Sequence, residues 1–531
     1  MKSGREATGA LVVGAGPTGL MVSAEIQSGG LPTTLIERRQ EEESNLTRAF
    51  AVHARTLEIL DACGLADRLV TRGKTIDGFQ PFGRINLDLS KLPSRFPFVL
   101  ITPQYETERV LREYATKVGV EILRGTEFTA LLQDADGVDV QLRSTRDGKV
   151  STRRAAFVVG ADGAHSKVRQ SLSMPFPGHS SKISWLMLAD VRLAKEPTQV
   201  IAANATGDDF VFIAPFGDGW YRVFAWNRQM RDPEGGSLSL DPVKEITRRA
   251  MGTDFGMHEP RWISRFHNDE RQVPEYQRGR VFLAGDAAHV HSPAGGQGMN
   301  TGIQDAANLG WKLAAVGRGD APAALLDTYQ TERHPVGKRV VQLTERLVDL
   351  VTLRNPFLRA TRNVVGGIAT HLPPISERFA GAVSGVGISY TAPPGSHKLV
   401  GKRVSDLALD GGPHTPERLY ELLRRRKFVV LCPVAELLSV TEVAKPWSRH
   451  LELAAARAKA EQSLVLVRPD GYVAWASSER ASPRRDAMLK RALEQWCGKP
   501  THPGEGDTVV GSRSPVYARR NSSTRTSRFS E

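Results

Sequence analysis

Short apolar segments alternate with amphipathic and glycine-rich segments along most of the chain. Near the N-terminus, residues 10–13 and 33–36 are apolar runs, and residues 20–27 between them read as a helix that ends near Gly29-Gly30. Apolar runs of about four residues are typical of strands that are buried on both faces of a parallel sheet. The pattern therefore predicts strand, helix and parallel strand, the beginning of an α/β domain.

A glycine motif connects the first predicted strand to the helix. Residues 14–19 read G-A-G-P-T-G and match the pattern G-x-G-x-x-G. In this pattern Gly14 permits a tight turn, Gly16 lets the backbone approach a pyrophosphate, and Gly19 lets helix and strand pack closely. The helix start offers N–H groups and a partial positive charge to phosphates. Glu37 follows at about the 20-residue spacing of an acid that binds a ribose, so these features predict a dinucleotide site.

The same region also loosely resembles a secretory signal. Lys2 and Arg5 precede a stretch without charges over residues 10–24, which ends in V-S-A. The glycine motif, the two flanking strands and the acid together favour the dinucleotide site.

A second segment runs from an apolar strand into an acidic turn. Residues 157–160 are apolar, Asp162-Gly163 follows them, and a polar helix start leads to Arg169. This arrangement alone is also typical of a simple turn with a helix cap.

A third segment has a similar form but a longer loop. Residues 281–283 form an apolar strand, an acid follows at position 286, and a glycine-rich loop covers residues 293–300. A helix is predicted from there over about 301–315. Such a loop lets the backbone approach a planar ligand, and the helix start stabilises negative charge on it. The alternative to such a ligand-binding loop is a glycine-rich connection without a binding role.

The three motifs in this order resemble the class A FAD-dependent aromatic hydroxylases, which are related to para-hydroxybenzoate hydroxylase and phenol hydroxylase. The resemblance covers roughly residues 8–390. Residues 253–256 (T-D-F-G) and 261–266 (R-W-I-S-R-F) resemble the subgroup that hydroxylates aromatic polyketides and antibiotics, including rifampicin-type enzymes. No second glycine fingerprint is evident, which is normal in this family and argues against a two-dinucleotide reductase.

The resemblance implies an α/β fold: a Rossmann-type FAD-binding domain, an inserted mixed β-sheet substrate domain and a C-terminal thioredoxin-like domain. The expected boundaries are 8–174 and 276–390 for the FAD-binding domain, with 71–103 partly in the substrate region, 175–275 for the substrate domain, and 395–500 for the C-terminal domain. The tail, 501–531, is rich in Ser, Thr, Arg and Gly and is expected to be disordered.

The resemblance also implies roles for individual residues. It places Pro293, Gly295 and Gly298 in the pocket floor at flavin C4a and assigns no catalytic acid or base, since His289 and His291 read better as buried structural histidines. The implied FAD contacts are Gly14, Gly16, Pro17, Thr18, Gly19, Glu37 and Arg38 for the AMP half, Arg48, Gln104 and Arg109 near the pyrophosphate and ribityl chain, Asp162 and Arg169 with a further role in NAD(P)H use, Gly285 and Asp286 for the ribityl hydroxyls, and Pro293, Gly298, Met299 and Asn300 at the ring.

The middle of the chain is rich in aromatic residues. Residues 211–213 and 221–225 read as neighbouring strands around a turn at 217–219. Aromatic side chains on one face would form an apolar wall for a planar substrate, although ordinary sheet core explains any single one equally well. The weak candidates for substrate binding are Phe212, Trp220 and Trp226.

The resemblance implies a monooxygenase that consumes NADPH or NADH and O2 and hydroxylates a phenolic or polyketide ring through a flavin C4a-hydroperoxide. Baeyer–Villiger insertion and epoxidation use the same apparatus and remain open. A flavin reductase and a flavin-bound scaffold protein are the alternatives without oxygen chemistry.

Composition limits the other function classes. Hydrophobic residues make up 40% and charged residues 24% of the 531 residues, which is ordinary for a soluble globular protein. The net charge is +13, but there is no long basic stripe with interleaved aromatics, so no nucleic-acid partner is expected. The cysteines, Cys63, Cys432 and Cys497, are far apart and odd in number, which predicts reduced thiols and no metal site. The sequence thus predicts a cytoplasmic monomer or homodimer, without a membrane partner, that binds a small aromatic molecule.

Overall fold

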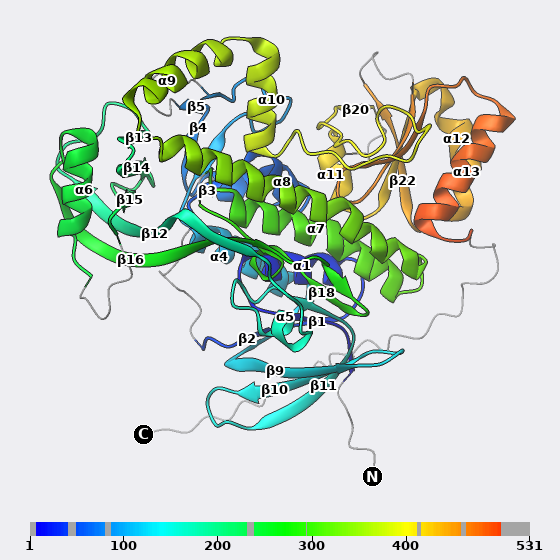
Figure 1. The fold of residues 1–531 in the computed structure, drawn as a ribbon. Coiled ribbons are helices and arrows are strands. Elements are labelled where there is room, and N and C mark those ends of the chain that lie inside the picture. The colour runs from blue at the N-terminus through cyan, green and yellow to red at the C-terminus, as the bar shows by residue number, and fades with distance from the viewer. Residues whose placement is uncertain are drawn as a thin grey trace, which may run out of the picture.

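The computed structural model describes residues 7–40, 49–79, 87–230, 238–293, 295–410, 416–457 and 463–500. Arg48 and the tail 501–531 lie outside the described residues. The described chain has a mixed α/β fold with an eight-stranded, a six-stranded and a five-stranded sheet and two small ones (Figure 1). In Figure 1 the long helices α7 (Gln297–Gly317) and α8 (Asp327–Val351) cross the middle of the molecule, between the six-stranded sheet on the left and the five-stranded sheet on the right.

The predicted strand–helix–strand unit at the N-terminus is confirmed. It consists of β1 (Ala7–Val13), α1 (Pro17–Ser28) and β2 (Thr33–Glu37). β1 pairs in parallel with β2 and with β11 (Val150–Gly160), and β11 pairs in parallel with β18 (Val281–Leu283). The strands that precede the three motifs are therefore neighbours in the order β18-β11-β1, and their carboxyl ends meet at one edge of the sheet. The large sheet is completed by β8 (Glu121–Arg124), β9 (Thr126–Gln133), β10 (Val138–Ser144) and β17 (Gln277–Arg278).

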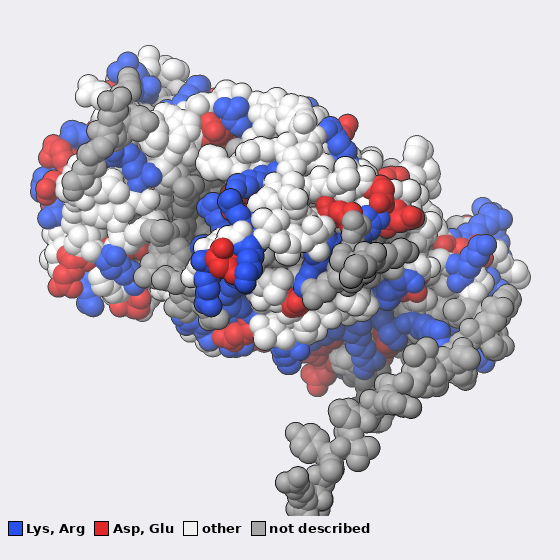
Figure 2. Space-filling model, turned by 90° about the horizontal axis from the view of Figure 1, so that it is seen from below, with Lys and Arg blue, Asp and Glu red and all other residues white. Residues whose placement is uncertain are grey.

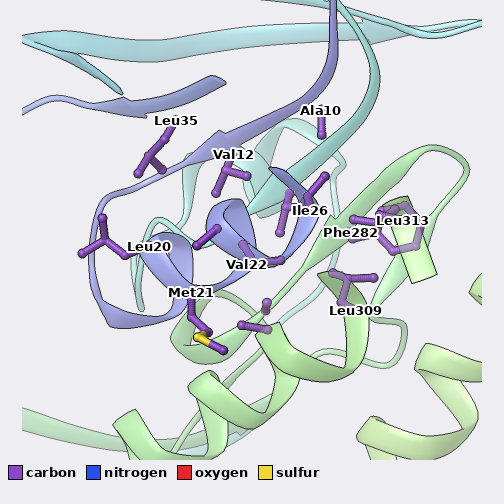
Figure 3. Packing of buried hydrophobic residues seen from close by; sticks show 14 of the residues in the cluster. Ala10, Val12, Leu20, Met21, Val22, Ile26, Leu35, Phe282, Leu309 and Leu313 are labelled. Atoms are coloured by element: carbon purple, nitrogen blue, oxygen red, sulfur yellow. The ribbon is translucent and has the colours of Figure 1, made fainter. Parts of the chain in front are cut away.

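The main core lies between this sheet and α7, with α1 in the middle. Leu20, Val22 and Ile26 of α1 are at most 2% exposed, as are Leu309 and Leu313 of α7, and all belong to one cluster (Figure 3). Burying each such side chain contributes about 1.5–3 kcal/mol. The stretch that loosely resembles a secretory signal is thus part of the folded core.

The six-stranded sheet contains the predicted aromatic hairpin. β14 (Asp209–Pro215) and β15 (Tyr221–Asn227) pair antiparallel, with Phe212 opposite Phe224, which confirms the predicted neighbouring strands. β15 pairs with β12 (Gly178–Leu193), and β12 pairs with β16 (Met257–Gln272). The remaining elements of this region are β13 (Ala202–Ala205), β19 (His289–Val290) and α6 (Asp241–Met251).

Segments before residue 103 also pack against this sheet. β3 (Ala51–Val52), β4 (Lys74–Ile76) and β7 (Val99–Ile101) form a small sheet, and β5 (Gly78–Phe79) pairs with β6 (Leu87–Asp88). Apolar residues of these segments share a core cluster with residues of the six-stranded sheet. The helices α2 (Ala54–Asp61), α3 (Ala66–Val70) and α4 (Gln104–Lys117) connect this part to the large sheet.

The C-terminal part forms a mixed five-stranded sheet in the order β20-β22-β21-β23-β24. β21 and β22 are parallel, and the other pairs are antiparallel. The strands are β20 (Leu409–Asp410), β21 (Phe428–Cys432), β22 (Leu451–Ala456), β23 (Leu464–Val467) and β24 (Val473–Ser477), and the helices are α11 (Leu419–Leu423), α12 (Leu437–Ala444) and α13 (Pro483–Cys497). Between α8 and this sheet lie α9 (Pro356–Thr370) and α10 (Pro373–Ser384).

Buried charges connect the C-terminal sheet to α7 and α8. Glu332 of α8 accepts hydrogen bonds from Arg468 at 2.5 Å and from Lys312 of α7 at 2.8 Å, and Arg468 also pairs with Asp470. The cations of Lys312 and Arg468 thus face the carboxylates of Glu332 and Asp470. These four buried side chains together carry no net charge. Burial lowers the pKa of Lys312 to about 8, and Glu332 acts in the opposite direction.

One predicted boundary is wrong. The helix expected from about Thr301 begins at Gln297, so Gly298, Met299 and Asn300 lie in its first turn and not in a loop. Gly296 in the left-handed conformation (φ 62°) ends the glycine-rich loop and allows the helix to begin there. The pattern of apolar positions concealed this because the first turn contains small and polar residues.

Lys and Arg side chains form several separate groups on the face shown in Figure 2, with Asp and Glu between them. Cys63, Cys432 and Cys497 are free thiols. None of the described helices combines the length and apolar character needed to cross a bilayer.

Candidate active site

All three motifs border one cavity of about 650 Å³. Residues 16–18 of the first motif, 163–165 and Arg169 of the second, and 296–299 of the third contribute to its wall. The cavity lies where the carboxyl ends of β1, β11 and β18 meet, the edge at which open α/β sheets bind ligands. Strand β16 of the six-stranded sheet supplies the opposite side through residues 266–269 and 271.

The glycine motif has the backbone geometry that its sequence predicts. Gly14 has φ +100°, and a Cβ on Gly19 would lie 1.8 Å from the Gly14 carbonyl oxygen, so helix and turn are in direct contact. A Cβ on Gly16, in contrast, would meet nothing within 4 Å. Gly16 therefore leaves open space directly at the start of α1, where N–H groups without intrahelical partners can bind an anion. This open space fits a pyrophosphate.

Glu37 is held by backbone and side-chain donors at the end of β2. Its carboxylate accepts hydrogen bonds from the Ala15 N–H and the Arg39 N–H, both at 2.9 Å, and pairs with the Arg39 guanidinium at 3.1 Å. Burial alone would raise its pKa, but these donors hold the pKa of Glu37 below its usual range. Arg38, the predicted FAD contact, and Arg39 are both exposed, and Arg39 is the residue that pairs with Glu37.

In the second motif the arginine lines the cavity, whereas the acid does not. The Asp162 carboxylate accepts hydrogen bonds from the Ser166 hydroxyl at 2.5 Å and the Lys167 N–H at 2.7 Å, so it stabilises the start of α5 (Lys167–Ser171). Arg169 lines the cavity and donates to the carbonyls of Ala164 and Ala287. Arg169 therefore connects the second motif to the third.

The third motif is anchored by a fully buried triad. Asp305 of α7 accepts hydrogen bonds from Arg333 at 2.7 Å and from the Gly285 N–H at 3.2 Å, and it bonds His289 at 2.8 Å. Burial would raise the pKa of Asp305, but Arg333 and His289 lower it, so the carboxylate is charged. This triad fixes the Gly285-Asp286 turn, and Asp286 lines the cavity.

The start of α7 forms one end of the cavity. Pro293, Gly296, Gly298 and Met299 line it, and Gly295 (φ +82°) makes the preceding turn. The Asn300 side chain is buried: it donates to the Ala51 carbonyl at 3.0 Å and accepts from the His53 N–H at 2.9 Å. This side chain therefore ties α7 to the segment around β3.

Of the two FAD contacts predicted on α4, one lines the cavity and the other does not. Gln104 lines the cavity, accepts from the Ala49 N–H at 3.1 Å and donates to Glu108 at 2.7 Å. Arg109 pairs with Glu106 at 3.1 Å and, like Glu37 and Asp162, lies outside the described cavity wall.

The aromatic wall of the cavity contains phenylalanines that were not among the predicted substrate-binding residues. Phe50 and Phe224 line the cavity, their ring centroids are 5.2 Å apart, and Phe212 packs behind both of them. Trp220 lies 4.6 Å from the Arg261 guanidinium, and Trp226 packs beside Arg228, so both side chains stack on arginines away from the described wall. Phe224 could have been identified from the sequence, because the predicted hairpin places it opposite Phe212.

His291 is a neutral group in the cavity wall. Burial lowers its pKa to about 4, although the Ser292 carbonyl at 2.9 Å from Nδ1 acts in the opposite direction. A Cβ on Gly298 would lie 3.9 Å from both the His291 ring and the Asp286 carboxylate, so these groups meet at the start of α7.

This depressed pKa predicts a pH dependence of stability. Between about pH 6.5 and pH 4 the unfolded chain binds a proton at His291 that the folded chain excludes, so acidification through this range destabilises the fold. Replacing His291 by Asn should make the thermal midpoint fall less steeply over this range. Equal slopes for the wild type and the variant, or titration of His291 near pH 6.5 by NMR, would contradict the prediction.

Comparison with known families and proteins agrees with this geometry. The family described as "FAD binding domain" matches residues 7–344, and the family "Aromatic-ring hydroxylase, C-terminal" matches residues 397–500. The chain is 37% identical over 496 residues to rifampicin monooxygenase of Streptomyces venezuelae, covering 92% of this chain and 99% of the relative.

Solved structures show the same similarity. The OxyS anhydrotetracycline hydroxylase from Streptomyces rimosus is 34% identical, with a TM-score of 0.81 over 93% of this chain and 100% of that structure. CabE, an aromatic hydroxylase from angucycline biosynthesis, is 36% identical, also with a TM-score of 0.81, over 93% of this chain and 99% of that one. The open space at Gly16, the helix starts and the shared edge of three motif-bearing strands fit FAD. The chain therefore belongs to the FAD-dependent aromatic-ring hydroxylases and is an aromatic monooxygenase.

Proposed function

We propose that the 650 Å³ cavity is where FAD, an aromatic polyketide-type substrate and NADPH or NADH come together. The observation that carries the proposal is the convergence of all three motifs on a cavity that also has phenylalanine rings in its wall. Two of the reported relatives act on rifampicin and anhydrotetracycline, which are large aromatic molecules. The substrate class is therefore a fused or extended phenolic ring system.

FAD would extend along the edge of the large sheet. Its pyrophosphate would lie at the start of α1, beside Gly16, and its ring at the start of α7. Gly285 and Asp286 would meet the ribityl chain between them. The full set of proposed contacts is Gly14, Gly16, Pro17, Thr18, Gly19, Glu37, Arg38, Arg48, Gln104, Arg109, Asp162, Arg169, Gly285, Asp286, Pro293, Gly298, Met299 and Asn300, to which the geometry adds Arg39.

When bound and reduced by NAD(P)H, FAD supplies the activation of O2 from which one oxygen atom passes to the substrate and the other leaves as water. The N–H groups at the start of α7 favour negative charge on a ring placed there. Pro293, Gly295 and Gly298 give a floor without polar side chains, which keeps water away from the reacting atoms. Phe50 and Phe224 would hold the flat face of the substrate ring.

The division of the chain follows the same proposal. The large sheet with α1 and α7 would hold the cofactor. The six-stranded sheet, of which strands β12–β16 are inserted between β11 and β18, would cover the substrate. The five-stranded C-terminal sheet, with one parallel and several antiparallel pairs, supports a thioredoxin-like domain. Cys432 in β21 is buried, and burial raises its pKa to about 11, so a packing role suits it better than redox exchange.

The proposal predicts an oxygenated product from an aromatic polyketide. Purified protein with NADPH or NADH, 18O2 and a panel of phenols and tetracycline-like or rifamycin-like compounds should give a product that contains one labelled oxygen, detected by mass spectrometry. Ring hydroxylation would support the proposal, and a lactone or an epoxide would replace it with Baeyer–Villiger or epoxidase activity. Nicotinamide oxidation without labelled product for any aromatic compound would favour a reductase, and its complete absence despite bound FAD would favour a scaffold protein.

A further inference from the structure

Three potential metal ligands meet outside the cavity, where α8 crosses the six-stranded sheet. His179 of β12 and Glu270 of β16 are direct partners across the two strands, and Glu345 comes from α8. The His179 Nε2 lies 3.4 Å from the Glu270 Oε2 and 3.5 Å from the Glu345 Oε1. One ligand atom from each residue lies within 4.8 Å of the others. Residues from three separate elements thus converge on one point.

The two distances fit shared coordination better than hydrogen bonding. A charge-assisted N–H to carboxylate bond measures about 2.7–2.9 Å, which is clearly shorter than either distance. Two ligand atoms at about 2.0–2.1 Å from one tetrahedral Zn²⁺ are separated by roughly 3.3–3.4 Å. The spacing of the histidine nitrogen from both carboxylates is therefore close to that of neighbouring ligands on one ion.

Glu270 gives an independent indication of a ligand. Its side chain is only 2% exposed, yet its Oε2, the atom that faces His179, has no hydrogen-bond partner among the described residues. Burying a carboxylate oxygen without a partner is costly. Burial raises the pKa of Glu270, and the nearby Glu345 and Asp349 carboxylates act in the same direction, whereas the Ser181 hydroxyl and His179 oppose them. Asp349 is paired with Lys182.

We propose that His179, Glu270 and Glu345 bind a divalent transition-metal ion of the Zn²⁺ type. One imidazole and two carboxylates suit Zn²⁺ or Co²⁺, whereas Mg²⁺ and Ca²⁺ prefer sites made of oxygen only. Three protein ligands leave the fourth position of a tetrahedral ion open. Water can occupy it, because His179 and Glu345 are partly exposed to solvent.

The ion would tie α8 to two strands of the six-stranded sheet. Asp269 and Arg271, the neighbours of Glu270 in β16, line the cavity. Glu270 itself is absent from the described cavity wall, so the metal would bind behind that wall. The ion therefore fixes the position of a cavity wall and takes no part in the flavin chemistry.

The test uses full-length protein with its FAD, freed of metal by chelation and dialysis. Calorimetric titration with Zn²⁺ should give one site with a dissociation constant of about 1 μM or below, and Co²⁺ should give the visible absorption of a low-symmetry N/O site. His179→Ala and Glu345→Gln should each weaken Zn²⁺ binding at least about tenfold, since even residues that only support a ligand contribute that much. Zn²⁺ should raise the thermal midpoint of the wild type more than that of either variant.

His258→Ala is the matched control, because this exposed histidine bonds the nearby Gly256 carbonyl at 3.0 Å and is no part of the proposed site. It should bind Zn²⁺ as the wild type does. Glu345 is 44% exposed, so Glu345→Gln should keep the wild-type fold and FAD content even if a change at His179 perturbs the sheet. The proposal is overturned if the wild type shows no single site, or if Glu345→Gln binds Zn²⁺ as tightly as the wild type.

Discussion

Replacing Gly16 by valine should abolish tight FAD binding and leave the fold intact. A Cβ at this position meets nothing within 4 Å of the chain's own atoms, and the backbone has φ −75°, which valine adopts without strain. The side chain would instead occupy the space proposed for the pyrophosphate. Losing two charge-assisted hydrogen bonds at the start of α1 costs about 1.5–3 kcal/mol each, so FAD affinity should fall at least roughly a hundredfold.

The measurement is FAD affinity of the apoprotein by fluorescence, together with far-UV circular dichroism and the thermal midpoint without FAD. Gly19→Ala is the contrasting variant, because its Cβ would lie 1.8 Å from the Gly14 carbonyl oxygen and must displace backbone. It should yield misfolded protein. If Gly16→Val keeps wild-type FAD affinity, the pyrophosphate does not lie at the start of α1.

Replacing Asp305 by leucine should destabilise the protein more than any surface change. Arg333 and Asp305 are both 0% exposed, so the substitution leaves a guanidinium buried without its carboxylate. Breaking a buried pair in this way costs about 3–5 kcal/mol. The Gly285-Asp286 turn also loses the acceptor of its Gly285 N–H, so FAD should be retained less well. The free energy of the first unfolding transition in urea and the FAD content after purification measure both effects.

Two further variants test whether the buried, unpaired Arg333 causes the loss of stability. Glu245→Gln removes a solvent-exposed partner of Arg248 and should cost less than about 1 kcal/mol. The double variant Asp305→Leu with Arg333→Leu removes both buried charges and should recover part of the lost stability. A loss below about 1 kcal/mol for Asp305→Leu would show that the triad does not hold this part of the core.

Local patterns were sufficient to predict the elements that carry the motifs. The runs at 10–13 and 33–36 became parallel strands because continuous apolar sequence can be buried on both faces of a sheet. The alternating aromatic residues at 211–225 became a hairpin because a turn with glycines lies between them. Glycine positions were equally informative, since Gly14 requires a backbone angle that other residues rarely adopt.

The sequence by itself therefore determined the glycine turn, the strands around it and the resemblance to flavin hydroxylases, because each depends on neighbouring residues. Only the tertiary structure decided that Phe50 faces Phe224 and that Asp305 holds the third motif. It also brought His179 to Glu345 on a distant helix. Such contacts join residues far apart in the chain, and their geometry depends on how whole sheets and helices pack, which no local pattern encodes.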